Sequence, residues 1–507
     1  MSPSTVLRTL FFSLALTALT AGVLPGGFVY AQSSPRGDSA TSPSEATETC
    51  VDCHSLATPG IVSDWLKSRH AQTTVAEALV KEAVERRVSA ENIPDELLES
   101  SVGCAECHML HPEKHADTFE HMDADIHVVV TPTDCATCHR VEADEYSMNL
   151  MSHAYGNLAD NSLYMALVGT INGIQHFDGE GLVAGRPDDL TNAESCFYCH
   201  GTRVEVTGTR TLETDIGDLE FPVLSGWPNQ GVGRVNPDGS LGCCASCHTR
   251  HRFSIDVARK PATCSECHKG PDVPAYKVYA VSKHGNLYAS HKTEWEFGSV
   301  PWVPGRDFSA PTCAACHASL LATEDGQVIA QRTHRMNDRL EWRIFGLPYA
   351  HPHPLSPSTS GIRNAGGLPL PTALTGQPAA EFLIGQDEMD ARRGRLQQVC
   401  LTCHASGWVE PQFARLHHVI ETANEMTLTA TKILSEAWTR GLAEGPVQGG
   451  NPFDEPIEKM WVEQWLFYAN STRFASAMGG ADYGAFANGR WSLSKNAREM
   501  EEWLRGR

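Results

Sequence analysis

Positive charge, strand-like periodicity and long apolar runs are all scarce in this sequence of 507 residues. Its 61 Asp and Glu outnumber its 40 Lys and Arg, which gives a formal charge of -21. Phosphate binding needs clustered Lys and Arg, so this balance argues against a nucleic-acid partner. After the N-terminal segment no stretch is apolar enough to cross a bilayer, so we do not expect an integral membrane protein. No long alternation of apolar and polar residues indicates a sheet.

The N-terminal segment, residues 1–31, has the features of a secretory signal. Arg8 precedes an apolar run from Leu10 to Leu24, and Ala31 supplies a small residue at the expected cleavage site. An uncleaved N-terminal anchor is the alternative. Residues 32–49 are rich in Ser, Thr, Pro and acidic residues, so we expect a flexible leader there. The protein is therefore predicted to be periplasmic or otherwise exported, and soluble after cleavage.

Unassigned cysteine is scarce as well, because eight C-x-x-C-H motifs use 16 of the 17 cysteines and leave only Cys243. In this motif the two thiols form thioethers with one heme, and the histidine takes an axial position on its iron. Zinc sites and disulfide frameworks do not require a histidine after every second cysteine. We therefore predict eight covalently bound hemes c. Cys243 is expected to be a small buried residue, with pairing between chains as the alternative.

The predicted attachment cysteines and proximal iron ligands, from the first motif to the eighth, are Cys50, Cys53 and His54; Cys104, Cys107 and His108; Cys135, Cys138 and His139; Cys196, Cys199 and His200; Cys244, Cys247 and His248; Cys264, Cys267 and His268; Cys313, Cys316 and His317; and Cys400, Cys403 and His404.

Of the 23 histidines, the 15 outside the motifs can supply second axial ligands to low-spin hemes. The candidates for these distal ligands are His70, His153, His251, His284 and His334. One further ligand is expected from the cluster of His111, His115, His121 and His127, with His121 as the candidate. His351 and His353 are instead expected in an exposed loop stiffened by prolines.

A mainly α-helical fold is expected, with helices and loops wrapped around the hemes, because the gaps between motifs are mostly short, polar and turn-rich. Two helices are predicted, an amphipathic one over Ala76–Val88 and a longer one over residues 456–477 that ends at Gly479. We expect an octaheme domain over residues 50–410 and a helical C-terminal region over 411–507.

One face of the longer predicted helix carries Ile457, Trp461, Trp465 and Tyr468 at helical spacing. Such a stripe indicates core packing, and contact with another subunit is the alternative.

The chain resembles the octaheme hydroxylamine oxidoreductase family in the order and spacing of all eight motifs, from Cys50 to about Asn488. The tightest local matches are Thr249 to Ser254 after the fifth motif, Arg259-Lys260-Pro261, Ser282 to Gly285, and Ala310 to His317. The resemblance implies a secreted, usually trimeric protein whose fourth motif carries the catalytic heme, with seven electron-transfer hemes around it. No free histidine stands between His200 and the fifth motif, which permits an open position on that iron.

The resemblance further implies redox conversion of a small nitrogen compound, hydroxylamine or nitrite, with a partner cytochrome or quinone-linked protein exchanging the electrons. In oxidative members, a tyrosine from the C-terminal region of a neighbouring subunit is bonded to the catalytic heme. Ungapped register places Phe486 at that position here, and Tyr483 is the nearby candidate for such a link.

The family's distal acid and histidine correspond to Ala262 and Val273, which cannot transfer protons. Asp272 is the main candidate to replace them, and Glu266, Tyr276 and His291 are further substitutes. The alternative function is an electron-transfer or partner subunit without its own catalytic site, whose fourth heme has gained a sixth ligand such as His176.

Overall fold

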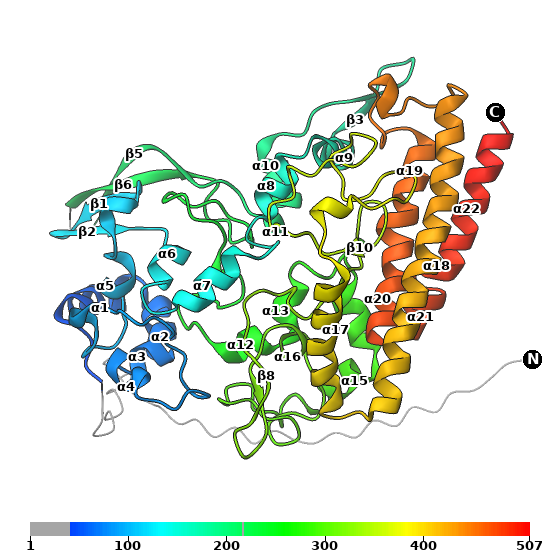
Figure 1. Cartoon of the computed structure of the whole chain (residues 1–507). Coiled ribbons are helices and arrows are strands. Elements are labelled where there is room, and N and C mark those ends of the chain that lie inside the picture. Colours follow the sequence, from blue (N-terminus) through cyan, green and yellow to red (C-terminus); the bar gives the residue numbers. More distant parts are fainter. Residues whose placement is uncertain (1–40, 215–216) are drawn as a thin grey trace, which may run out of the picture. The chain divides into compact units, whose positions relative to one another are not determined.

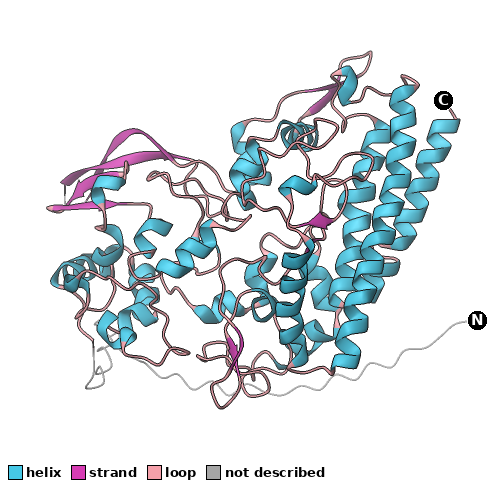
Figure 2. Ribbon diagram, viewed as in Figure 1, coloured by secondary structure: helices cyan, strands magenta, loops and turns pink. Residues whose placement is uncertain are grey.

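The computed structural model describes residues 41–214 and 217–507, so the expected signal peptide and the first half of the expected leader, residues 32–40, lie outside the described residues. The described chain is mainly helical, as predicted, and its strands form five two-stranded sheets. Short helices separated by long loops make up most of it, and long helices occur only toward the C-terminus (Figure 2).

The predicted leader ends earlier than residue 49, because helix α1 (Glu45–Ala57) begins at Glu45. Ser44 caps this helix, and its hydroxyl oxygen accepts a hydrogen bond from the Thr47 N–H. Thr47 is fully buried and donates a hydrogen bond to Glu106 at 2.8 Å. These contacts order the last residues of the predicted flexible segment, so that part of the prediction is wrong.

Short helices carry or flank most C-x-x-C-H motifs. One helical turn brings the first cysteine and the histidine of a motif together, since residues four apart are neighbours on a helix. In the second and third motifs the histidine N–H bonds to the carbonyl of the first cysteine at 2.8 Å. The helices that follow α1 in this part of the chain are α2 (Pro59–Leu66), α3 (Arg69–Gln72), α4 (Val75–Leu79), α5 (Ala105–His108), α6 (Pro132–Cys135), α7 (Arg140–Ser147), α8 (Ala154–Ala159), α9 (Ser162–Asn172), α10 (Asp189–Glu194), α11 (Cys196–His200), α12 (Ile255–Arg259), α13 (Pro261–Ser265), α14 (Ala275–Val281), α15 (Lys283–His291) and α16 (Cys313–His317).

The strands pair as antiparallel hairpins, and the longest, β5 with β6, projects beyond the neighbouring loops (Figure 1). The five pairs are β1 (Thr118–His121) with β2 (Ala124–His127), β3 (Gln175–Phe177) with β4 (Leu182–Ala184), β5 (Glu205–Thr214) with β6 (Gly217–Ser225), β7 (Leu321–Ala322) with β8 (Val328–Ala330), and β9 (Trp342–Arg343) with β10 (His351–Pro352). Single 3-10 turns lie at Asp95–Leu97, Pro112–Lys114, Cys244–Ser246, Ala380–Phe382 and Pro446–Gln448.

The helix predicted over Ala76–Val88 is shorter than expected, because α4 ends at Leu79. Beyond it the chain turns toward the third motif, where the Ser89 and Ala90 N–H groups bond to the Cys138 carbonyl oxygen. This attachment competes with continuation of the helix, so the expected length is wrong.

The C-terminal region is a packed group of long helices. In Figure 1 α18, α19, α20 and α22, coloured orange to red, run side by side. The helices are α17 (Gln386–Leu401), α18 (Ser406–Thr439), α19 (Pro456–Val462), a π-helical segment (Glu463–Ala469), α20 (Asn470–Met478), α21 (Ala481–Ala485) and α22 (Arg490–Arg505). The expected start of this region at residue 411 falls inside α18.

The helix predicted over residues 456–477 is confirmed, since α19, the π-helical segment and α20 are continuous from Pro456 to Met478. Gly479 ends it with a φ of 78°, a left-handed conformation that glycine adopts without steric cost. Trp461 and Trp465 are at most 2% exposed and pack with Phe453 in one apolar core. The aromatic stripe is therefore core within this chain, although Tyr468 is only half-buried.

None of the described helices combines the length and apolar character needed to cross a membrane.

Candidate functional site

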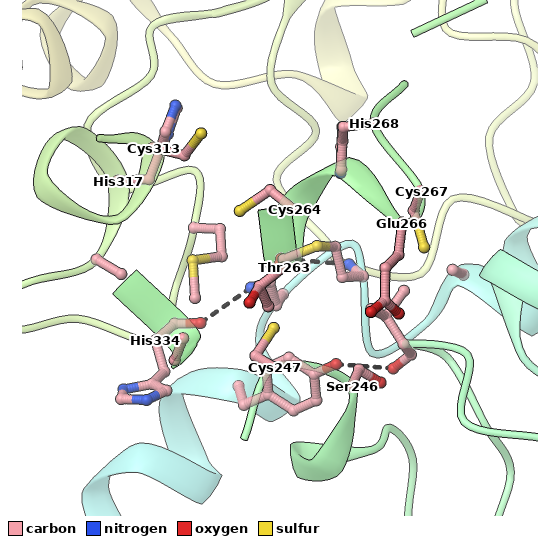
Figure 3. A pocket seen from close by; sticks show the side chains of 18 of the residues that line it. Ser246, Cys247, Thr263, Cys264, Glu266, Cys267, His268, Cys313, His317 and His334 are labelled. Carbon is pink, nitrogen blue, oxygen red and sulfur yellow. Dashed lines mark hydrogen bonds between the residues drawn. The ribbon is translucent and has the colours of Figure 1, made fainter. Parts of the chain in front are cut away.

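One large cavity of about 2810 Å³ reaches seven of the eight C-x-x-C-H motifs, from the second to the eighth. Small-molecule pockets typically measure about 300–1,000 Å³. Figure 3 shows part of this cavity, with Cys247, Cys264 and Cys313 around one space and His334 at its border. Its size fits several macrocycles that share one interior.

Cysteines of different motifs meet in pairs along this interior. Cys50 lies beside Cys104, Cys135 beside Cys244, Cys199 beside Cys267, and Cys264 beside Cys313. Cys107 is a near neighbour of Cys138, Cys247 of Cys264, and Cys316 of Cys400. These contacts place the motifs in a row in space, in the order first, second, third, fifth, sixth, seventh and eighth. The fourth motif lies beside the sixth.

Several motif histidines are held through Nδ1. His139 Nδ1 lies 3.0 Å from the Arg87 carbonyl oxygen, and His200 Nδ1 lies 3.2 Å from that of Ala154. A metal-ligating histidine ordinarily donates its second ring N–H to such an acceptor, which fixes the tautomer and leaves the other nitrogen for the metal. The same kind of contact is made by His54 with Thr58 Oγ1 and by His108 with the His127 carbonyl oxygen. These side chains fit the role of heme iron ligands.

Four motif histidines face a second histidine. Two trans imidazoles bonded to one metal at about 2.0–2.1 Å place their ring centroids about 6 Å apart. The observed separations are 6.2 Å for His54 and His121, 6.1 Å for His139 and His70, 6.4 Å for His248 and His334, and 6.1 Å for His404 and His284. The structure thus brings four of the predicted distal candidates opposite motif histidines.

Burial keeps these imidazoles neutral. Desolvation, with a smaller contribution from the nearby His139, lowers the pKa of His70 to about 4. Desolvation likewise lowers the pKa of His248 to about 4, with His334 contributing. Iron is ligated by the neutral ring, so burial favours the binding form.

Two other predicted distal histidines are not placed so clearly. Burial, with a smaller contribution from the nearby His108, lowers the pKa of His251 to about 4. His153 is half-buried, and its Nε2 lies 2.9 Å from the Ser147 carbonyl oxygen. The ring of His127 lies 6.0 Å from that of His108, but on the Nδ1 side, since His108 Nδ1 bonds to the His127 carbonyl.

The expectation of an exposed loop at His351 and His353 is wrong, because these residues are 2% and 4% exposed. The segment pairs with β9 and turns inward, where the Ala350 N–H donates to Asn424 on helix α18. Neither ring nitrogen of His353 has a hydrogen-bond partner in the described chain, and this residue lines the cavity. The proline-rich sequence alone gave no sign of this burial.

The side chains around His200 differ from those at the paired histidines. Burial lowers the pKa of His200, while the charges of Arg343 and Asp272 act on it in opposite directions. Asp272 and Val273 both line the cavity, as do Glu266 and Tyr276. Ala262 is exposed and outside the cavity lining, and His291 forms an exposed ion pair with Glu294 at 3.1 Å. Of the predicted substitutes, His291 is thus not brought to the cavity.

Of the remaining candidate residues, Tyr483, Phe486 and His176 do not line the cavity, whereas Cys243 does. Tyr483 is half-buried in α21 and packs beside Val278 and Phe474, while Phe486 is 71% exposed. His176 is exposed on β3 and does not line the cavity. Cys243 is 2% exposed, as expected.

Comparisons with known proteins agree with the multiheme character and the fold of this chain. A family model described as seven times multi-haem cytochrome CxxCH matches residues 238–342, and one for cytochrome c554 and c-prime matches residues 49–128. A solved structure described as a hypothetical multiheme protein is 41% identical with a TM-score of 0.86, and the alignment covers 92% of this chain and 96% of that one. This chain belongs to the multiheme cytochromes c.

Two relatives from Kuenenia stuttgartiensis are more distant from this multiheme cytochrome. A probable nitrite reductase–hydroxylamine oxidoreductase fusion protein is 25% identical over 419 residues, which are 77% of this chain and 38% of that protein. The cytochrome therefore spans well under half the length of this curated relative. A chain of a reducing hydroxylamine oxidoreductase-like protein complex has 20% identity and a TM-score of 0.60, with 91% and 85% of the two chains covered. That likeness shows the fold.

Proposed function

We propose that this multiheme cytochrome carries eight hemes c and converts hydroxylamine or nitrite at the heme of the fourth motif. In this proposal Cys196 and Cys199 attach that heme, His200 ligates its iron, and the other seven hemes exchange electrons with a partner cytochrome or quinone-linked protein. Heme supplies the redox-active iron on which a small nitrogen ligand can bind. The chain itself holds that iron, positions the other hemes for electron transfer with it, and delivers protons.

The observation that carries the proposal is the contrast between His200 and the four paired motif histidines. Within the described chain, imidazoles face His54, His139, His248 and His404, whereas the charges of Arg343 and Asp272 act on His200. Asp272 also acts on His268 of the sixth motif, so it lies between the two motifs. An imidazole on both sides fills the coordination of an electron-transfer heme, and ionisable groups beside an open position suit proton-coupled chemistry. Asp272 is the proposed proton donor.

The proposed assignment of electron-transfer hemes rests on pairs of histidines. We assign His121, His70, His334 and His284 as distal ligands of the first, third, fifth and eighth hemes, and His251 to the second. For the sixth and seventh hemes, His153 and the newly recognised His353 are the candidates. His353 is favoured because a buried imidazole with two unpaired nitrogens is costly unless it binds something.

A reductive direction fits the cytochrome better than an oxidative one. Phe486 stands where oxidative members have the cross-linked tyrosine, and Tyr483 packs within its own chain. The relative in the Kuenenia complex is described as reducing. A homotrimer and an exported location belong to the same proposal and rest on the family resemblance and the N-terminal sequence.

Carbon monoxide binding to the fully reduced, purified holoprotein tests the proposal, because this ligand needs a vacant or weakly held iron position. A spectral shift in about one-eighth of the heme signal is expected if one of eight hemes is open. No shift would identify an electron-transfer or partner subunit instead.

A further inference from the structure

Arg343 places a guanidinium without an acceptor at the wall of the heme cavity. It lies on β9 and lines the cavity together with His200. The residue is half-buried, its Nε atom is buried without a hydrogen-bond partner, and no carboxylate of the described residues acts on its charge. A buried charge of this kind is unfavourable unless it is paired, so the site calls for an anion.

Two other buried arginines donate to oxygen atoms of this chain, although the Arg473 Nε, like that of Arg343, has no hydrogen-bond partner among the described residues. Arg473 donates to the Ile344 carbonyl and to the side chains of Asn470 and Asn424. Arg259 donates to the carbonyls of Phe297 and Ser299 and lies 4.5 Å from the ring centroid of Trp302. Burial of a guanidinium is therefore not by itself a sign of a ligand here; the lack of acceptors sets Arg343 apart from these two.

The neighbours of Arg343 connect it to the fourth motif. Its charge acts on His200 and on Tyr164, a buried residue of α9 that also lines the cavity. Tyr164 packs in one apolar cluster with Phe197 and Cys196 of the fourth motif. Two hydrogen-bond donors, a guanidinium and a phenol, thus border the cavity beside the heme attachment residues.

The position of Arg343 is fixed by packing on the wall that also carries Val273. The guanidinium lies 4.9 Å from the ring centroid of Phe345, and Phe345 belongs to the cluster that contains Val273. Asp272, adjacent in sequence to Val273, lines the same cavity. The charges of Arg343 and Asp272 both act on His200, which places the two residues near the fourth motif.

We infer that Arg343 is an anion-binding residue, which holds a planar oxyanion beside the heme of the fourth motif with Tyr164 as a second donor. The planar fork of a guanidinium matches two oxygen atoms of one anion, as in carboxylates and nitrite. The inference rests on the proposed function and narrows it, because it makes an anionic nitrogen oxide the preferred ligand over neutral hydroxylamine. A heme propionate offers the same oxygen pair, and the experiment separates these two sources.

The test compares nitrite binding to the oxidised holoprotein with carbon monoxide binding to the reduced holoprotein, both followed by visible spectra. The variants are Arg343→Gln, which removes charge and fork, and Arg343→Lys, which keeps the charge. Arg395→Gln is the matched control, because Arg395 does not line the cavity and pairs with Glu388 at 3.2 Å. Heme content of each variant, measured in parallel, reports folding.

Nitrite should bind about 10- to 100-fold more weakly to Arg343→Gln, the loss expected for a charged hydrogen bond. Arg343→Lys should lie between this variant and the wild type, with carbon monoxide binding and the control unchanged. Unchanged nitrite affinity in Arg343→Gln overturns the inference. Arg343→Gln could instead shift the reduction potential of one heme and change nitrite and carbon monoxide binding equally. That result would mean that the guanidinium binds a heme propionate, and it also overturns the inference. If the wild-type holoprotein binds neither nitrite nor carbon monoxide, the proposed function itself is wrong, whatever the variants do.

Discussion

The part of the chain that carries the C-x-x-C-H motifs and the C-terminal helices build their interiors differently. In the C-terminal region, Phe453, Trp461 and Trp465 are at most 2% exposed and fill a continuous apolar core. In the motif-bearing part, short helices and loops surround a cavity of about 2810 Å³. Every 100 Å³ of dry cavity costs about 2 kcal/mol, and a whole domain has only about 5–15 kcal/mol of stability. Hemes must therefore be structural as well as redox groups in the motif-bearing part, whereas side chains suffice in the C-terminal region.

The largest effect should follow from removing one heme from the motif-bearing part. We predict that Cys196→Ser combined with Cys199→Ser lowers the heme content by one heme and abolishes turnover of nitrite and hydroxylamine, because no thioether remains at the fourth motif. Intact mass and a heme assay measure the first effect, and reduced-dye kinetics the second.

Cys243→Ser is the control for this double variant. Cys243 is 2% exposed and adjacent to the fifth motif, but it is not part of any motif. Its substitution should leave the heme content unchanged. Loss of a heme in this control would refute the assignment of the other 16 cysteines as attachment residues.

The C-terminal core can be weakened without touching a heme. Trp461→Ala should lower the free energy of unfolding by about 3–5 kcal/mol, the usual cost of deleting a buried tryptophan. It removes the contact with Phe453, at 6.2 Å between centroids, and a hydrogen bond to Thr431. Denaturation followed by circular dichroism measures the change, and the heme spectrum in the absence of denaturant should not alter.

Trp491→Ala is the matched surface variant, since Trp491 is 63% exposed. It should change stability by less than about 0.5 kcal/mol. Equal losses for both tryptophans would mean that the C-terminal helices are not stabilised by the core described above.

A smaller, pH-dependent effect is expected from a buried ion cluster in the motif-bearing part. His115 lies 3.1 Å from Asp134 and 3.6 Å from Asp117, and all three side chains are buried. Burial opposes the charged ring, but the contacts with Asp117 and Asp134 outweigh it and raise the His115 pKa from 6.5 to about 9. The fold therefore retains a proton that the unfolded chain releases between these values. This contribution to stability is complete below pH 6.5 and is lost as the pH rises through 9.

The expected loss over that pH window is up to about 3 kcal/mol, since each unit of pKa difference corresponds to about 1.36 kcal/mol. His115→Gln should abolish this component of the pH dependence of unfolding. His291→Gln, at an exposed ion pair with Glu294, should leave it in place. The same pH dependence in His115→Gln as in the wild type would exclude the cluster as its source.

The sequence predicted the features that depend on residues close together in the chain. The motifs predicted the heme attachment sites, and the aromatic stripe from Ile457 to Tyr468 predicted the long helix and its buried face. His70, His284 and His334 could be selected from the sequence as histidines outside the motifs, and His284 also stands in the segment Ser282 to Gly285 that matches the family. Their placement opposite His139, His404 and His248 depends on contacts across long stretches of chain, which spacing does not contain.

The failures occurred where tertiary contacts override local preference. The amphipathic pattern of Ala76–Val88 continues past Leu79, but the chain leaves the helix to reach Cys138. His351 and His353 look like loop residues, yet pairing with β9 carries them inside. Arg343 gave no signal at all, because arginine is ordinarily exposed and only the folded cavity shows that its guanidinium lacks an acceptor.

The smallest expected effect concerns the link between the C-terminal region and the catalytic heme. We predict that Tyr483→Phe leaves the visible spectrum of the reduced protein unchanged, because Tyr483 packs beside Val278 and Phe474 in its own chain and Phe486 stands at the cross-link position. Loss of a red-shifted band in this variant would contradict the prediction and favour an oxidative enzyme. Phe486→Tyr is the complementary change. A new red-shifted band there would mean that the heme pocket is already able to form the link, and that one side chain separates the two directions of catalysis.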